Sequence, residues 1–257
     1  MTIDEMKKRK KELGYSYDQI SELSGVPLGT VQKVFSGVTA SPRYDTLYAL
    51  EQILGKGDRQ IGEEAFGCPE KKQGEYTLED YYQLPEDVHM ELIDGVIYNM
   101  SSPSSIHQLL CGLIYGKLLG YVSTCRNSCV PMISPIDVQL DCDEKTMVQP
   151  DIAVVCDRNK VMEHCIYGAP DFIIEVLSPT TKKRDSIIKL NKYMSAGVRE
   201  YWLIDPDKKI VIVYDFEHEE YPAIYGFDSR VPVHIWEKKC EINFREIYEY
   251  IRFLYEK

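Results

Sequence analysis

The spacing of apolar residues changes along the chain, and this change limits the folds that the chain can adopt. In the first part, apolar residues recur every three or four positions, which is typical of amphipathic helices, and strand signals are absent. From Gly55 to Glu75 the sequence is rich in glycine and charge, as linkers are. The remainder mixes helical and strand patterns. We therefore expect domains at 1–57 and 76–257, joined by a linker at 58–75.

The first domain contains a helix-turn-helix pattern in the segment SYDQISELSGVPLGTVQKVFSG. This segment predicts one helix from about Ser16 and a second from about Pro27, which Gly37 can end. Gly25 lies in the turn, and Val31 takes the inward position of the second helix. The expected structure is a small all-α helix-turn-helix domain.

Over roughly residues 3–55, this domain resembles the Cro and phage-repressor type of DNA-binding domain. The resemblance implies that Thr30, Gln32 and Lys33 face the major groove of DNA. It also implies that Lys33 and Arg43 bind phosphate. The alternative is a helical bundle whose polar face serves for dimerisation or for docking a protein.

The net charge of −11 argues at first against a nucleic-acid partner, because phosphate binding usually needs an excess of lysine and arginine. That charge is unevenly divided along the chain. Residues 1–57 hold eight basic and seven acidic residues, a net of +1, which leaves −12 for the rest. The first domain is therefore the part suited to DNA.

Composition also bears on where the protein resides. No apolar run approaches the roughly 18 residues that a membrane span needs, so we expect a soluble protein and no membrane partner. The start MTIDEMKKRKK lacks the apolar segment of a secretory signal, which predicts a cytoplasmic location. The eight cysteines contain no CxxC pair, so we expect reduced thiols, with neither a zinc site nor a disulfide framework.

The second domain predicts a mixed sheet flanked by helices, a fold of the α+β or α/β class. Helices are expected over YTLEDYYQL, from about Ser104 to Val122 and from about Lys182 to Ala196. The segment HMELIDGVIYNM predicts a hairpin that turns at Asp94-Gly95. Further strands are expected at MISPIDVQL, DIAVVC, DFIIEVLS, EYWLID and KIVIVYDF.

Three carboxylates fall where these elements can bring them together. Asp151 stands at the start of one strand, Glu175 lies inside the apolar strand FIIEVL, and Glu91 belongs to the hairpin. An unpaired buried carboxylate costs several kcal/mol, so Glu175 needs a cation, a set of donors or a metal ion. Clustered carboxylates repel one another and suit a hard cation, which makes Mg²⁺ or Mn²⁺ the expected cofactor.

With these residues in place, almost all of residues 76–250 resemble the PD-(D/E)XK nuclease superfamily, and within it the Uma-two family of restriction-endonuclease-like proteins. The resemblance rests on MELIDGVIYNMSSPSSIH, VQPDIAVVCD, FIIEVLSPTTKKRDSIIKLNKYMSAGVREYWLIDP and INFREIYEY. It implies a restriction-endonuclease-like fold in which Asp151 and Glu175 fill the first two positions of the superfamily's motif. Glu91 is a further acid, and all three would bind the metal ion.

One position departs from the superfamily's pattern. Leu177 stands where a lysine is expected, and a leucine cannot stabilise the charge that develops in the transition state. Lys189, on the following helix, is the predicted substitute, because many members of the family carry a lysine at the matching place. Lys192 is the second candidate. The structural alternative for Lys189 is an ion pair with Asp185 on a solvated helix face.

Other conspicuous residues are expected to have structural roles. His107 resembles a position that the family often fills with histidine; an ordinary histidine at a helix start is expected, with a catalytic role as the alternative. TTKKRD is expected to be a solvated turn, with contact to phosphate as the alternative. Of Asp137 and Asp141, which alternate with apolar residues in and just after the predicted strand MISPIDVQL, only Asp137 is placed to reach the site.

These features predict a DNA-binding, divalent-metal-dependent endonuclease with Glu91, Asp151, Glu175 and Lys189 as its catalytic residues. One alternative is a DNA-binding regulator whose second domain is inactive and serves dimerisation or sensing. Another is a phosphodiesterase that acts on RNA or on a small phosphate ester. A homodimer is expected by analogy with helix-turn-helix proteins that read two half-sites.

Overall fold

The computed structural model describes most of the chain. The described residues are 3–13, 17–24, 26–37, 39, 42, 46–47, 49–50, 54, 71–85, 89–100, 102–178, 184–218 and 221–256. The chain divides into two compact units, Met1–Gly67 and Cys68–Lys257. The division falls within the predicted linker at 58–75.

The described helices of the first unit are α1 (Ile3–Leu13), α2 (Tyr17–Ser24) and α3 (Leu28–Ser36). Their apolar residues form a core that includes Met6, Ile20, Val31 and Val34. The predicted second helix is confirmed, since α3 follows Pro27 and ends at Gly37, whose φ of 80° lies in the left-handed region that glycine tolerates.

The second unit begins with a short helix and a hairpin. Helix α5 (Leu78–Tyr82) precedes strands β1 (Met90–Ile93) and β2 (Val96–Asn99), which pair antiparallel. Asp94 and Gly95 turn the hairpin with φ values of 51° and 75°, as the sequence predicted. Helix α6 (Ser105–Cys125) follows, and the side chain of Ser104 caps it by accepting a hydrogen bond from the backbone N–H of His107.

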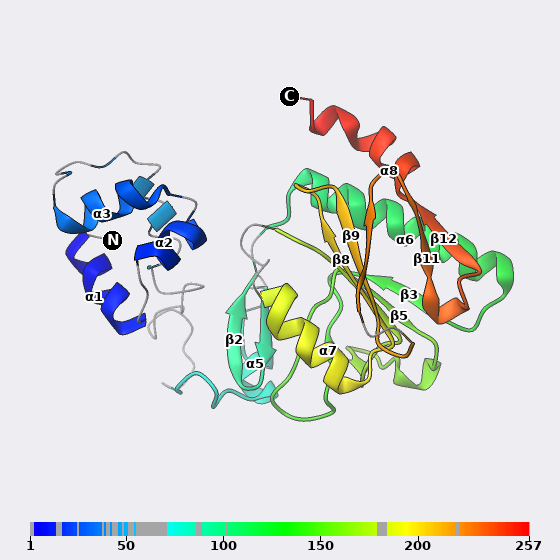
Figure 1. Ribbon diagram of the computed structural model, residues 1–257. Helices are drawn as coiled ribbons and strands as arrows, with labels where there is room; N and C mark the ends of the chain where they lie inside the picture. The colour runs from blue at the N-terminus through cyan, green and yellow to red at the C-terminus, as the bar shows by residue number, and fades with distance from the viewer. Residues whose placement is uncertain are drawn as a thin grey trace. The chain divides into compact units, whose positions relative to one another are not determined.

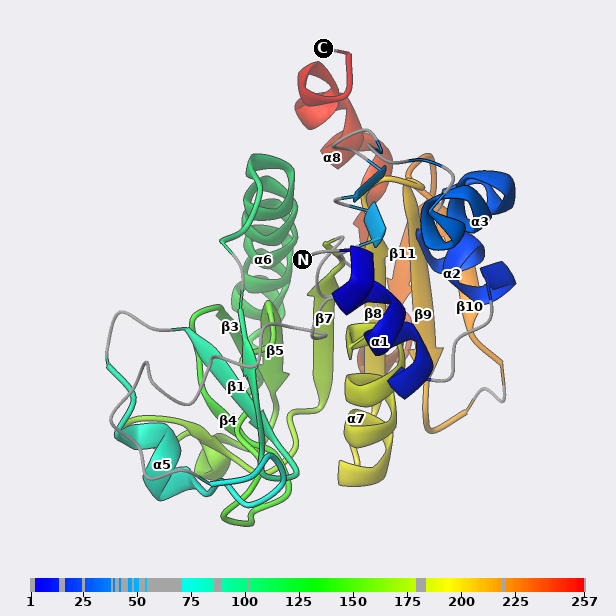
Figure 2. The same ribbon diagram turned by 90° about the vertical axis from the view of Figure 1, so that its left-hand side faces the viewer.

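A six-stranded mixed sheet forms the centre of this unit (Figure 1), and Figure 2 shows its strands in the order β10-β9-β8-β7-β5-β3. Only β7 and β8 run parallel within it. The strands are β3 (Val130–Ile133), β5 (Ile152–Val155), β7 (Phe172–Val176), β8 (Glu200–Asp205), β9 (Ile210–Asp215) and β10 (Ala223–Gly226). The predicted strand MISPIDVQL is divided into β3 and the short β4 (Val138–Gln139), because Pro135 has no N–H to donate to a ladder.

Helices cover both faces of the sheet. Helices α6 and α8 (Phe244–Ile251) belong to the core on one face, together with strands β11 (Arg230–Val233) and β12 (Cys240–Asn243). On the other face α7 (Leu190–Ala196) contributes Tyr193 to a second core (Figure 2). A π-helical turn, η2 (Arg184–Lys189), leads directly into α7. The predicted mixed sheet flanked by helices is confirmed.

The remaining short elements connect these layers. They are β6 (Ile166–Tyr167), which pairs with β4, and the 3-10 turns η1 (Arg158–Lys160), η3 (His234–Trp236) and η4 (Arg252–Leu254). Within the described residues, none of the helices combines the length and the apolar character that a bilayer crossing requires.

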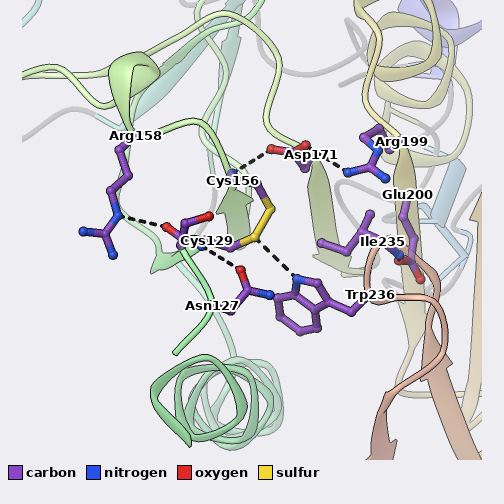
Figure 3. The surroundings of a disulfide bond; sticks show 10 residues. Asn127, Cys129, Cys156, Arg158, Asp171, Arg199, Glu200, Ile235 and Trp236 are labelled. Carbon is purple, nitrogen blue, oxygen red and sulfur yellow. Dashed lines mark hydrogen bonds and ion pairs between the residues drawn. A yellow bond between two sulfur atoms is a disulfide. The ribbon is translucent and has the colours of Figure 1, made fainter. Parts of the chain in front are cut away.

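Two of the cysteines are joined, so the expectation that all thiols are reduced is wrong for this pair. Cys129 and Cys156 form a disulfide at one end of the β3–β5 pair (Figure 3). The register that aligns Val130 with Val155 sets the two cysteines opposite each other. They are 27 residues apart in sequence, so no local spacing of cysteines predicts the bond. The Nε1–H of Trp236 donates to Cys129 Sγ at 3.4 Å.

Candidate active site

The three predicted acids come from strands or strand ends of the second unit. Glu91 lies on β1, Asp151 directly precedes β5, and Glu175 lies on β7. Strands β5 and β7 are neighbours in the sheet (Figure 2). Their register pairs Ile152 with Ile174, so Asp151 and Glu175 follow at the same end of the pair. All three carboxylates are buried.

Lys189 brings two of these acids together. Its Nζ lies 2.6 Å from Glu91 Oε1 and 2.6 Å from Glu175 Oε1. The ion pair with Asp185 also exists, at 3.7 Å, but the Lys189 side chain is only 2% exposed. The alternative of a solvated helix face is therefore wrong. Lys192, the second candidate, pairs with Asp94 and Asp141 instead.

Leu177 takes no part in the site. It packs in the apolar core on the α7 side of the sheet and is 7% exposed. The ammonium group beside the acids is thus supplied by Lys189 at the end of η2, the next element after β7, and not by the residue two positions after Glu175.

Two residues of the segment TTKKRD belong to the site, which the sequence analysis missed. Arg184 and Asp185 are buried, so the described end of this segment is no solvated turn; residues 179–183 lie outside the described residues. Arg184 Nε lies 3.4 Å from Glu91 Oε2. The spacing of four residues between Asp185 and Lys189 was the available signal, because it places both on one side of a helical turn.

Asp151 is held from two sides. Its Oδ2 accepts a hydrogen bond from the backbone N–H of Val176 at 2.7 Å and lies 3.1 Å from His107 Nε2. His107 thus points from the first turn of α6 into the site, where the sequence favoured a structural histidine and left a catalytic one as the alternative. Asp137 does not line the site; it accepts hydrogen bonds from the side chains of Tyr81 and Gln149.

These groups surround a pocket with a cavity volume of about 100 Å³. Its wall includes the carboxylates of Asp151, Glu175 and Asp185, together with Lys189. Glu91 is not among the residues of the wall, but it contacts Lys189, which is.

Burial and charge set the protonation of the site. Burial raises the pKa of Glu175 well above its usual range. The charge of Lys189 lowers this pKa, whereas the neighbouring carboxylates raise it further. Burial would lower the pKa of Lys189, but Glu175, Glu91 and Asp185 together raise it. Burial would also raise the pKa of Glu91, yet the cations beside it hold it below its usual range. The ammonium group therefore stays charged.

The residues present suit a divalent cation. Four buried carboxylates, Glu91, Asp151, Glu175 and Asp185, face two basic side chains, which leaves a formal charge of −2. Carboxylate oxygens are the ligands that Mg²⁺ and Mn²⁺ prefer. Within the described part of the chain, however, Glu91, Asp151 and Glu175 do not form a group with three donor atoms within 4.8 Å of one another.

The residues predicted to contact DNA lie on α3 of the first unit. Gln32 and Lys33 are exposed and Thr30 is half-buried, while the intervening Val31 is buried. This pattern leaves one side of the helix open to a ligand. Arg43, the remaining predicted contact, lies outside the described residues.

Comparisons with known proteins agree with both units. A family model described as "Helix-turn-helix" matches residues 6–60, and the Uma2 model, described as "Putative restriction endonuclease", matches residues 78–231. No curated protein matches the chain.

One similar solved structure is the crystal structure of "a putative nuclease belonging to DUF820" from Anabaena variabilis ATCC 29413. It is 24% identical, with a TM-score of 0.55, and the match covers 68% of this chain and 98% of that one. This likeness establishes the nuclease-like fold. The Uma2 model matches more than half of the residues of this chain, so the chain belongs to the Uma2 family of restriction-endonuclease-like proteins.

Proposed function

We propose that this protein is a divalent-metal-dependent endonuclease that hydrolyses phosphodiester bonds in DNA in the cytoplasm. The observation that carries the proposal is the position of Lys189, whose ammonium group lies 2.6 Å from both Glu91 and Glu175 beside a pocket that Asp151 lines. A buried lysine among acids provides the positive charge that the superfamily's motif would otherwise take from the position of Leu177.

Each residue has a distinct task in this proposal. Asp151 and Glu175 hold Mg²⁺ or Mn²⁺ through carboxylate oxygens, and Glu91, in contact with Lys189, completes the acid set by fixing that lysine. The bound ion would supply a Lewis acid and a water of lowered pKa. Lys189 stays protonated and stabilises negative charge on the phosphate as it develops.

The first unit supplies DNA binding. Thr30, Gln32 and Lys33 of α3 contact the major groove, and Lys33 and Arg43 contact phosphates. Joining a DNA-binding unit to a catalytic one raises the effective concentration of substrate at the pocket. A homodimer would let two such units read two half-sites.

The test is cleavage of plasmid and single-stranded DNA by the full chain with Mg²⁺ or Mn²⁺, beside a metal-free sample. Glu175→Gln and Asp151→Asn remove a ligand charge with little change in shape and are expected to abolish cleavage. Glu241→Ala, at an exposed glutamate on β12, is the control and should cut at the wild-type rate. Undiminished, metal-dependent cleavage by both site variants would refute the assignment.

The substrate class is tested in the same assay. Single-stranded RNA and a small phosphodiester are offered beside DNA. If either is cleaved while duplex and single-stranded DNA are not, the protein is a phosphodiesterase of another class, because fold and metal site alone do not name the substrate.

The second candidate is a DNA-binding regulator with an inactive second unit. It is favoured by the fact that Glu91 already pairs with Lys189 and Arg184 and accepts a hydrogen bond from the backbone N–H of Gln149 at Oε1, without a metal ion. The two candidates differ in their response to Mg²⁺. If the catalytic centre binds Mg²⁺, adding Mg²⁺ raises the melting temperature of the wild type by mass action, and Glu175→Gln abolishes that rise. If the unit is inactive and binds no metal there, the wild type and Glu175→Gln respond to Mg²⁺ in the same way.

A further inference from the structure

A histidine and a cysteine of α6 lie beside the acids, outside the predicted set of metal ligands. His107 and Cys111 are one helical turn apart and both line the pocket. Together with Asp151 they offer three donor atoms within 4.8 Å of one another. Among the residues that the structure describes, this is the only group of its kind with histidine, cysteine or carboxylate donors.

The histidine is oriented as a ligand would be. Its Nε2 faces the Asp151 carboxylate at 3.1 Å, and its Nδ1 lies 3.6 Å from Cys111 Sγ. In this geometry the Nε2–H of His107 donates to the carboxylate; a metal ion between the two groups would take the place of that proton, while Nδ1–H remains directed at Cys111 Sγ. Metal-binding histidines usually donate the opposite ring N–H to a neighbouring acceptor in this way.

The donor types determine which metal ion fits. Mg²⁺ prefers oxygen ligands and accepts nitrogen poorly, whereas first-row transition metals bind imidazole and carboxylate together. Beside an ion held by oxygens alone, the imidazole could only donate a hydrogen bond to the aspartate, whereas an ion that accepts nitrogen can be bound by both groups at their 3.1 Å separation. The presence of His107 therefore favours a transition metal.

We propose that His107 Nε2 and the Asp151 carboxylate together bind a divalent first-row transition metal ion, which this centre takes in preference to Mg²⁺. The inference rests on the proposed function, since it names the metal class of the same pocket. In this arrangement the Nδ1–H of His107 donates a hydrogen bond to Cys111 Sγ, and Cys111 is not itself a ligand.

The experiment measures metal binding without substrate. Mn²⁺ is titrated into the full-length protein and followed by electron paramagnetic resonance, and electron spin-echo modulation then reports whether a ¹⁴N nucleus is bound. We expect nitrogen modulation in the wild type. In His107→Gln the modulation should disappear and the Kd for Mn²⁺ should rise on the order of tenfold to hundredfold. The Kd for Mg²⁺, measured by competition, should hardly change.

His164→Gln is the matched control, because His164 is exposed and does not line the pocket. It should keep both the modulation and the affinity. Mn²⁺ binding without nitrogen modulation in the wild type, or modulation that survives in His107→Gln, overturns the inference. Cleavage of DNA in either case would leave the proposed function standing. Nitrogen modulation without any cleavage would instead support the inference and contradict the nuclease.

Discussion

At the scale of single residues, burial decides what an ion pair contributes. Lys189 and Lys239 each lie 2.6 Å from a carboxylate oxygen, but the Lys189 side chain is 2% exposed and that of Lys239 is 70% exposed. Water solvates the exposed pair almost as well when it is broken. The buried carboxylates around Lys189 have no water to solvate them if their ion pairs are broken.

Lys189→Met is therefore expected to destabilise the protein by about 3–5 kcal/mol, because it leaves buried carboxylates without their cation. Lys239→Met should leave the melting temperature almost unchanged. Urea unfolding of both variants measures the difference. Adding Mn²⁺ should recover part of the loss in Lys189→Met, since a divalent ion can replace the missing charge. An equal loss in both variants would show that Lys189 does not neutralise buried acids.

Glu200, the first residue of β8, is a buried acid that does not line the pocket. Burial raises its pKa to about 7, although the backbone N–H groups of Ile235 and His234 donate hydrogen bonds to it. The folded protein thus holds a proton on Glu200 at a pH where the unfolded chain, with the usual pKa of 4.5, has lost it.

This difference makes stability depend on pH. Because the folded state binds more protons between pH 4.5 and about 7, the contribution of Glu200 to the free energy of unfolding falls as pH rises through that window. The expected fall is about 3 kcal/mol. Subtracting the unfolding profile of Glu200→Gln from that of the wild type isolates it. A difference curve that stays flat from pH 5 to pH 8 would contradict this account.

At the scale of elements, the edge pair β3–β5 carries both a cross-link and a site residue. Asp151 directly precedes β5 and Cys156 directly follows it. The disulfide to Cys129 closes a loop across 27 residues, which restricts the unfolded chain. Oxidation therefore stabilises the sheet edge from which Asp151 is presented.

Reduction is expected to lower the free energy of unfolding by about 3–4 kcal/mol. Cys129→Ser should reproduce the loss without a reductant and should respond no further to one. Cys125→Ser, at an exposed free thiol, is the control and should unfold like the wild type. Melting each protein with and without dithiothreitol checks this. If the wild type melts at the same temperature in both conditions, the bond does not form in solution.

Some elements of the fold could be predicted from the sequence, and others could not. Strands such as β7 and β8 carry long apolar runs, and the Asp94-Gly95 turn requires positive φ, so local chemistry alone placed them. The disulfide depends on which residues face each other across two strands. That register is a property of the folded sheet and cannot be read from the local sequence around either cysteine.

The site shows the same division. Glu91, Asp151, Glu175 and Lys189 were recognised by their residue types within motifs, and the fold gathers them. Arg184 was missed because a π-helical turn, which has no periodicity that sequence reveals, carries it inward.

At the scale of the whole molecule, negative charge is unevenly divided along the chain. Residues 1–57 have a net charge of +1 and residues 58–257 a net charge of −12, so the repulsion of phosphate comes from the part outside the predicted helix-turn-helix domain. On the proposed function, DNA binding then depends on the helix-turn-helix domain. Mutations on α3 should change how tightly DNA is held without changing the chemical step.

Lys33→Ala is the direct test of this division. We expect weaker duplex binding and a slope of log K against log salt that is smaller by about one, because one phosphate contact is lost. KM for DNA should rise while kcat stays constant, since the residue contributes to binding but not to the transition state. Lys239→Ala removes an exposed lysine of the second unit and should alter none of these quantities. If Lys33→Ala lowers kcat and leaves the salt slope intact, α3 does not hold the DNA, and recognition belongs to the nuclease-like unit itself.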